Sequence, residues 1–127
     1  MKLTPVTGSF AVCRLGPDDP IPAVLSTARF VAIARTADEL SIVCLEAHAP
    51  EGARVERGWS CLKVEGPLPF LATGIMASLV TPLAAASIPI FAISTFDTDY
   101  LLFKDADRKR AVEVLRAAGH AVEVEGW

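Results

Sequence analysis

The sequence has no long uninterrupted apolar run and no paired-cysteine motif, and its one run of basic residues, Arg108-Lys109-Arg110, falls on an expected helix and is typical of a solvated face. Its 127 residues carry a formal net charge of −3, and this mild balance indicates neither nucleic acid nor an anionic membrane as a partner. The longest nearly apolar window, 75–93, is broken by serine, threonine and proline, which predicts a core helix followed by a strand and not a membrane span. The first residues lack the apolar segment of a secretory signal.

Cysteine and histidine are too sparse to indicate a metal or catalytic centre. Cys13, Cys44 and Cys61 form no CxxC pair and fall within expected strands, which favours buried thiols in a reducing cytoplasm. His48 and His120 have no nucleophile near them in the sequence and no metal-binding spacing. We therefore expect a cytoplasmic protein that is not an enzyme, with no catalytic residue, no metal and no cofactor.

Apolar residues make up 52% of the chain, and their pattern is clearest in the second half. It predicts a strand at 59–66, a helix at 73–86, strands at 88–94 and 98–104, a helix capped by Asp105 and stopped by Gly119, and a strand at 121–125. We expect Thr73 to cap the first helix, and Pro82 to bend it or restart it at Thr81. The order βαββαβ predicts an α+β, ferredoxin-like domain with both helices on one face of a four-stranded antiparallel sheet.

The first half has the pattern of a shortened copy of the second. A strand at 9–14 and a proline-rich connection at 16–28 precede a hairpin of strands at 29–35 and 40–46, with at most one short helix. An offset of 60 residues aligns Ile33 with Ile93 and Glu39 with Asp99, so that each hairpin has an acid at the same place. We expect two domains, 1–58 and 59–127. The second sheet is apolar on both faces, so the first half or a second subunit must cover one of them, which favours a homodimer.

A polar corner joins the two most apolar strands, and it is the most informative feature of the sequence. It contains Ser94, Thr95, Phe96, Asp97, Thr98 and Asp99. Carboxylates with hydroxyls at a strand end suit an ammonium or guanidinium group on a small zwitterion. Asp97 could instead serve only to shape the turn. Asp99 shares a side with Leu101 and Phe103, so it needs a partner if it is buried.

A second candidate for ligand contact is the segment 66–75, which leads into the first long helix and contains Gly74. Gly74 leaves the backbone amides of the helix start accessible, and the positive end of the helix favours a carboxylate. The alternative is that Gly74 serves only close packing. If the acidic corner lies beside this helix start, the two form a pocket that is polarised at both ends.

These motifs resemble the ACT domain, and most closely the small bacterial proteins of paired ACT-like domains related to CASTOR amino-acid sensors and aspartate kinase regulatory domains. The resemblance is carried by residues 62–68, 73–79 and 93–102, and in the first half by 36–44 and 56–59. It implies a complete ACT domain preceded by a truncated ACT-like half. It also implies an amino-acid site formed by Gly74 and Ile75 at the helix start with Thr95, Phe96 and Asp99 on the hairpin.

The leading hypothesis is therefore a non-catalytic regulatory module whose partner is a small molecule, an amino acid. The alternative is a structural or protein-interaction domain that has lost its ligand. One departure weakens a claim for arginine, because arginine-sensing relatives place an acid two residues before the helix glycine, where this chain has Ala72.

Overall fold

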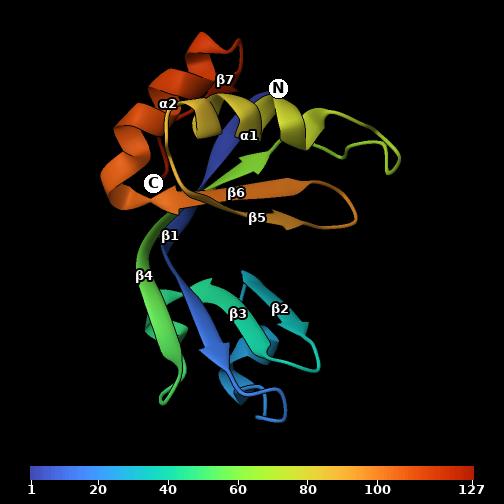
Figure 1. Cartoon of the computed structure of the whole chain (residues 1–127), viewed down its shortest axis with the longest axis vertical. Coiled ribbons are helices and arrows are strands. Elements are labelled where there is room, and N and C mark those ends of the chain that lie inside the picture. Colours follow the sequence, from blue (N-terminus) through green and yellow to red (C-terminus); the bar gives the residue numbers. More distant parts are fainter. The chain divides into compact units, whose positions relative to one another are not determined.

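The computed structural model describes residues 1–127 and divides into two compact units (Figure 1). The C-terminal unit comprises Met1–Thr7 and Trp59–Trp127, and the N-terminal unit comprises Gly8–Gly58. The division after Gly58 coincides with the boundary predicted from the sequence. The first seven residues, however, belong with the C-terminal unit, where the sequence placed them in the first domain. That the two parts are independent domains stays a prediction.

The C-terminal unit has the predicted α+β, ferredoxin-like fold. Its elements in chain order are β4 (Arg54–Val64, which begins in the N-terminal unit), α1 (Ile75–Ala85), β5 (Ile90–Ser94), β6 (Asp99–Lys104), the short 3-10 helix η3 (Asp105–Asp107), α2 (Arg108–Ala117) and β7 (Ala121–Val122). Strand β6 pairs antiparallel with both β4 and β5. Both helices lie on the same side of these strands (Figure 1). The confirmed βαββαβ order places the start of α1 and the β5–β6 turn at one end of the sheet.

The start of β1 (Lys2–Leu15) adds a strand that the sequence did not predict. The backbone N–H of Glu65 donates to the carbonyl of Lys2 at 2.9 Å, and β7 pairs in parallel with β1 at Lys2 and Leu3. This part of β1 therefore lies between β4 and β7. Pro5 and Gly8 lower the strand propensity of the segment, and for this reason the pattern placed the strand start only at residue 9.

Helix α1 begins two residues later than predicted. Its N-cap is Gly74, with φ of 80°, and not Thr73. A left-handed residue carries a steric cost for any side chain, whereas glycine adopts it freely, so the chain turns into the helix at the glycine. The expected break at Thr81 is also absent, because the helix continues through Pro82 to Ala85.

The core of the C-terminal unit lies between the two helices and one face of the sheet. Leu62 on β4 and Leu101 and Phe103 on β6 are fully buried there, against Leu83 of α1 and Leu115 of α2. Burying side chains of this size stabilises the fold by about 1.5–3 kcal/mol each. On the opposite face of the sheet, the register pairs Cys61 with Leu102. Both are also fully buried, and what covers them stays a prediction.

The N-terminal unit is the predicted truncated half, a three-stranded sheet without an α-helix. Residues 10–15 of β1 pair antiparallel with β3 (Leu40–Leu45), which also pairs with β2 (Val31–Arg35). Two 3-10 turns, η1 (Ala23–Thr27) and η2 (Glu46–His48), replace the single short helix that the sequence allowed. The core of this unit is formed by Ala11, Cys13, Leu25, Leu40, Ile42 and Cys44.

The two hairpin turns repeat each other closely, but the predicted alignment is wrong by one residue. In the N-terminal unit the Thr36 N–H donates to the carbonyl of Glu39 at 2.9 Å. In the C-terminal unit the Thr95 N–H donates to the carbonyl of Thr98 at 2.8 Å. Thr36 is therefore the counterpart of Thr95, and Glu39 is the counterpart of Thr98 and not of Asp99.

This register gives the two hairpins different chemistry. The residue that follows the turn is Leu40 in the first hairpin, where it is fully buried, and Asp99 in the second. Asp38 is the counterpart of Asp97 within the turn. Only the C-terminal hairpin therefore has an acid at its first strand residue, and the match of acids inferred from an offset of 60 does not hold.

Candidate ligand-binding site

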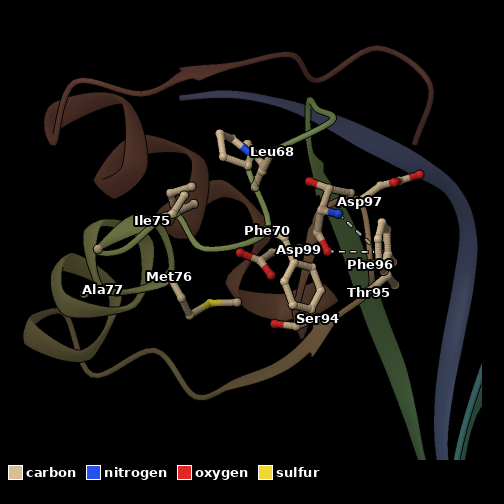
Figure 2. Close-up of a pocket in the computed structure, with 14 residues that line it drawn as sticks. Leu68, Phe70, Ile75, Met76, Ala77, Ser94, Thr95, Phe96, Asp97 and Asp99 are labelled. Atoms are coloured by element: carbon tan, nitrogen blue, oxygen red, sulfur yellow. Dashed lines mark hydrogen bonds between the residues drawn. The ribbon is translucent and has the colours of Figure 1, made fainter.

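The six residues predicted to bind a ligand all line one cavity of about 620 Å³ in the C-terminal unit (Figure 2). They are Gly74, Ile75, Thr95, Phe96, Asp97 and Asp99. One wall comes from the segment after β4 and the start of α1, and the other from the end of β5, the turn and the start of β6. The lining includes Leu68, Phe70, Gly74, Ile75, Met76, Ser94, Thr95, Phe96, Asp97, Thr98 and Asp99. The spatial proximity that the sequence required is therefore present, whereas ligand contact by these residues stays a prediction.

Hydrogen bonds fix the turn between β5 and β6 in place. Thr98 is buried, and its hydroxyl donates to the carbonyl of Val64 at 2.5 Å. The hydroxyl of Thr95 donates to the carbonyl of Thr98 at 3.0 Å. From the segment that leads to α1, the backbone N–H of Leu68 donates to the carbonyl of Asp97 in the turn at 2.7 Å. The turn is thereby anchored both to the end of β4 and to the segment that leads to α1.

Gly66 allows these two segments to approach each other. A Cβ atom at this position would lie 3.0 Å from the backbone nitrogen of Leu68 and 3.2 Å from the carbonyl oxygen of Asp97. Both contacts are with backbone, which cannot move aside as a flexible side chain can. A side chain at residue 66 would therefore push the turn away from the segment opposite it.

The start of α1 presents backbone donors without a side-chain cap. Gly74 makes no capping hydrogen bond, and the first helical bond runs from the Ser78 N–H to its carbonyl at 3.0 Å. The N–H groups of the first helical residues, Ile75 and Met76, have no acceptor within the helix. A Cβ on Gly74 would meet no atom within 4 Å, so close packing does not explain the glycine. The positive φ of Gly74 explains why this residue is a glycine, and the start of the helix remains open.

The two carboxylates of the cavity differ in exposure and direction. Asp99 is half-buried and pairs in register with Ser94 on the helix-covered face of the sheet. Its carboxylate points toward the start of α1, whereas that of the exposed Asp97 points away from α1 (Figure 2). No lysine, arginine or histidine lines the cavity. The hairpin side is therefore negative, and the helix start supplies the positive end.

Two aromatic rings lie at the cavity in largely exposed positions. The ring centroids of Phe70 and Phe96 are 5.0 Å apart, and the side chains are 70% and 79% exposed. Phe96 was predicted, Phe70 only as a member of the candidate segment 66–75, and Met76 was not identified as a lining residue. Residues 67–73 have no periodic pattern from which a direction could be read, and only the contact between the two rings reveals the role of Phe70.

A second cavity, of about 320 Å³, lies against the same turn. Thr95, Asp97 and Thr98 line both cavities, and Lys63 and Tyr100 line only the second. The register pairs Lys63 with Tyr100 on the sheet face that the helices do not cover. The positive charge of Lys63 is therefore on the other side of the turn from Asp99.

His120 and the cysteines have structural surroundings. The ring of His120 lies 3.1 Å from the amino nitrogen of Met1 and 3.0 Å from the carbonyl of Ser78. Burial raises the pKa of the Cys44 and Cys61 thiols to about 12, so they are protonated at neutral pH. No three His, Cys, Asp or Glu side chains cluster where they could bind a metal ion. Neither helix combines the length and apolar character needed to cross a bilayer.

Comparisons with known proteins agree with this fold. The family model for the ACT domain matches residues 54–117, and a second model, described as an N-terminal domain, matches residues 8–52. A crystal structure of an Agobacterium tumefaciens protein is 44% identical, with a TM-score of 0.90, and the match covers 98% of this chain and 92% of that one.

More distant structures are similar in fold alone. A Vibrio cholerae protein of unknown function, described as a possible transport protein, is 18% identical with a TM-score of 0.70 and coverage of 91% and 89%. The ligand-free regulatory subunit of aspartate kinase from Thermus thermophilus is 11% identical with a TM-score of 0.63 and coverage of 92% and 97%.

Proposed function

Because the chain belongs to the ACT domain family, we propose that it is a non-catalytic regulatory module that binds an amino acid or a similar small zwitterion. One observation carries the proposal: the start of α1 and the acidic β5–β6 hairpin line a single cavity of about 620 Å³. This volume falls within the range of about 300–1,000 Å³ that is typical of small-molecule sites. The fold shared with the regulatory subunit of an aspartate kinase supports a regulatory role.

In this proposal the two ends of the cavity bind opposite charges. The ligand carboxylate accepts hydrogen bonds from the free backbone N–H groups of Ile75 and Met76, where the helix dipole is equivalent to about half a positive charge. The ligand ammonium pairs with Asp99, which points toward the helix start. Thr95 and Phe96 form the hairpin wall, and Asp97 adds negative charge nearby.

The same lining argues against catalysis in this cavity. It contains no cysteine, histidine or lysine, so the hydroxyls of Ser94 and Thr95 have no imidazole or amine beside them to act as a base, and the two carboxylates have no cationic acid to work with. The three thiols are buried outside it, and burial raises their pKa. A role in binding therefore fits these residues better than turnover does.

Two further expectations belong to the proposal. The protein forms a homodimer, the commonest closed assembly of identical chains. It works in the cytoplasm, where its free cysteines stay reduced.

Thermal unfolding in the presence of each proteinogenic amino acid tests the proposal. A ligand at about 100 times its Kd stabilises the folded state by about 2.7 kcal/mol, an effect that melting curves resolve easily. The expected result is an increase in Tm with one amino acid or a small group, which is clearly smaller in Asp99→Asn and retained in full in Asp38→Asn, an exposed acid in the hairpin of the N-terminal unit. No increase with any amino acid, with wild type and Asp99→Asn behaving alike, would contradict the proposal.

The second candidate function is a protein-interaction domain without a ligand. It is favoured by Phe70, Leu71 and Phe96, three large apolar side chains that are exposed together, and by Ala72 in the place of an acid. A stoichiometric protein partner that binds equally well to wild type and to Asp99→Asn, together with an empty amino-acid screen, would support this candidate instead.

A further inference from the structure

An apolar surface extends beyond the cavity. Leu71 is 86% exposed and does not line the cavity, although it is next to Phe70, and Phe70 and Phe96 are 70% and 79% exposed. Soluble proteins rarely leave several large apolar side chains together in water, and such groups mark interaction sites. A small ligand in the cavity would leave Leu71 uncovered. We call these three residues, with the exposed Asp97 beside them, the acidic aromatic patch.

The same unit has a surface of opposite charge. A groove of about 370 Å³ between α2 and the end of the chain is lined by Arg108, Lys109, Val112, Arg116, Val124 and Trp127, with Glu113 as its one acid. We call it the basic groove. The exposed apolar surface of the groove comes from Val124, which is 46% exposed, and from the partly buried Trp127, whereas Val112 belongs to the buried core. Lys109 is exposed and forms no ion pair within the chain.

We propose that the acidic aromatic patch of one copy of the chain docks into the basic groove of a second copy. The aromatic rings and Leu71 contact Val124 and Trp127 in the groove, and the exposed carboxylate of Asp97 faces its cations. A symmetric contact of patch with patch fits less well, because it would bring the carboxylates of both copies together without a cation among the residues that line the cavity.

The position of the two surfaces determines the kind of assembly. The segment before α1 and the tip of the β5–β6 hairpin are at one end of the C-terminal unit, whereas α2 and the chain end are at the other (Figure 1). Patch and groove are different surfaces, so the contact is heterologous, and each copy that docks leaves its own groove or patch free for another. Through this contact, association extends beyond the proposed homodimer as protein concentration rises, or it closes into a ring. The contact does not require a ligand in the cavity.

Sedimentation velocity of the full chain over a range of concentrations tests the proposal. The sedimentation coefficient should rise with protein concentration, and the rise should weaken between about 0.1 M and 1 M salt, where the screening length falls from about 10 to 3 Å. Leu71→Ser in the patch and Lys109→Glu in the groove should each abolish the rise. Val24→Ser, at a 50% exposed apolar position, and Arg29→Glu, with the same change of charge, are the matched controls and should retain it.

A mixture of the two inactive variants distinguishes this contact from a symmetric one. The Leu71→Ser protein keeps an intact groove and the Lys109→Glu protein an intact patch, so the mixture should contain a species heavier than either variant alone. A symmetric patch contact could not be restored in this way. Since both substituted residues are exposed and outside the cavity, an empty amino-acid screen would leave these expectations unchanged.

Three results would overturn the proposal: no concentration dependence of the wild type, an assembly that neither substitution alters, or a mixture that sediments like its components. Unchanged melting curves will show that the variants are folded. If either variant proves to be unfolded, Leu71→Asn and Lys109→Gln make the same test with smaller changes.

Discussion

Replacing Thr98 by valine should destabilise the protein by removing the hydrogen bond that anchors the β5–β6 turn. Valine keeps the shape of threonine and loses only the hydroxyl, which donates to the carbonyl of Val64 at 2.5 Å. Thr98 is 5% exposed and Val64 is fully buried, so water does not readily replace the lost donor. A buried acceptor left without its partner costs about 1–3 kcal/mol.

The corresponding change in melting temperature is large enough to measure. For a chain of 127 residues, an unfolding entropy of about 2.1 cal/mol/K per residue makes each kcal/mol worth roughly 4 °C. The expected decrease in Tm for Thr98→Val is therefore roughly 4–11 °C. Amide hydrogen exchange should also become faster at Leu68 and Thr95, because their N–H groups bond to the turn.

Thr81→Val is the matched control, since it is the same substitution at an exposed threonine of α1. Surface changes of this kind usually alter stability by no more than about 0.5 kcal/mol. Differential scanning calorimetry of both variants gives the comparison. If Thr98→Val melts within about 2 °C of wild type, or if Thr81→Val loses as much stability, the hydroxyl of Thr98 does not hold the turn and the reasoning fails.

The remaining predictions concern the ligand, the helix start and the thiols. For the amino acid that raises Tm most, Asp99→Asn should weaken binding roughly 10- to 150-fold in calorimetric titration, as expected for a charged hydrogen bond worth about 1.5–3 kcal/mol. Asp97→Asn should weaken binding by no more than about fivefold, and a larger effect than that of Asp99→Asn would mean that Asp97 is the residue that pairs with the ligand ammonium. Gly74→Ala should lower the free energy of unfolding in urea by about 1–2 kcal/mol because φ is 80° there, although the new methyl group meets no atom; an unchanged value would mean that the left-handed turn is not required. Burial raises the pKa of Cys61 from 9.0 to about 12, so the contribution of this thiol to stability is complete below pH 9 and is lost as pH rises toward 12. The free energy of unfolding of Cys61→Ala should therefore decrease less steeply with pH over this interval than that of wild type, and equal slopes for the two proteins would contradict burial as the cause.

The sequence was sufficient for the fold of the C-terminal unit because its pattern is regular. Strands with both faces apolar and a helix with an apolar stripe leave few alternatives to βαββαβ. The start of β1 escaped prediction because Pro5 and Gly8 are uncommon inside strands, and its pairing with β7 joins residues from opposite ends of the chain. No local pattern encodes a pairing at such a separation.

The candidate site was predicted as a list of residues but not as a surface. Asp99 could be identified from its alternation with Leu101, since that period follows directly from strand geometry. Phe70 could not be singled out within the candidate segment 66–75, because that segment has no periodic pattern that would give the direction of its side chain. The alignment of the two hairpins also failed by one residue, because chemical similarity between Glu39 and Asp99 says nothing about which residue closes each turn.

The central claim is that one small zwitterion bridges the start of α1 and the carboxylate of Asp99. Two-dimensional NMR spectra of amide groups, recorded while each amino acid is added, test it most directly. The account predicts that the amide signals of Ile75, Met76 and Asp99 shift together with a single binding curve, while those of the sheet in the N-terminal unit stay in place. If no amino acid moves these signals, or if the shifts occur only away from α1 and the β5–β6 hairpin, the account is contradicted.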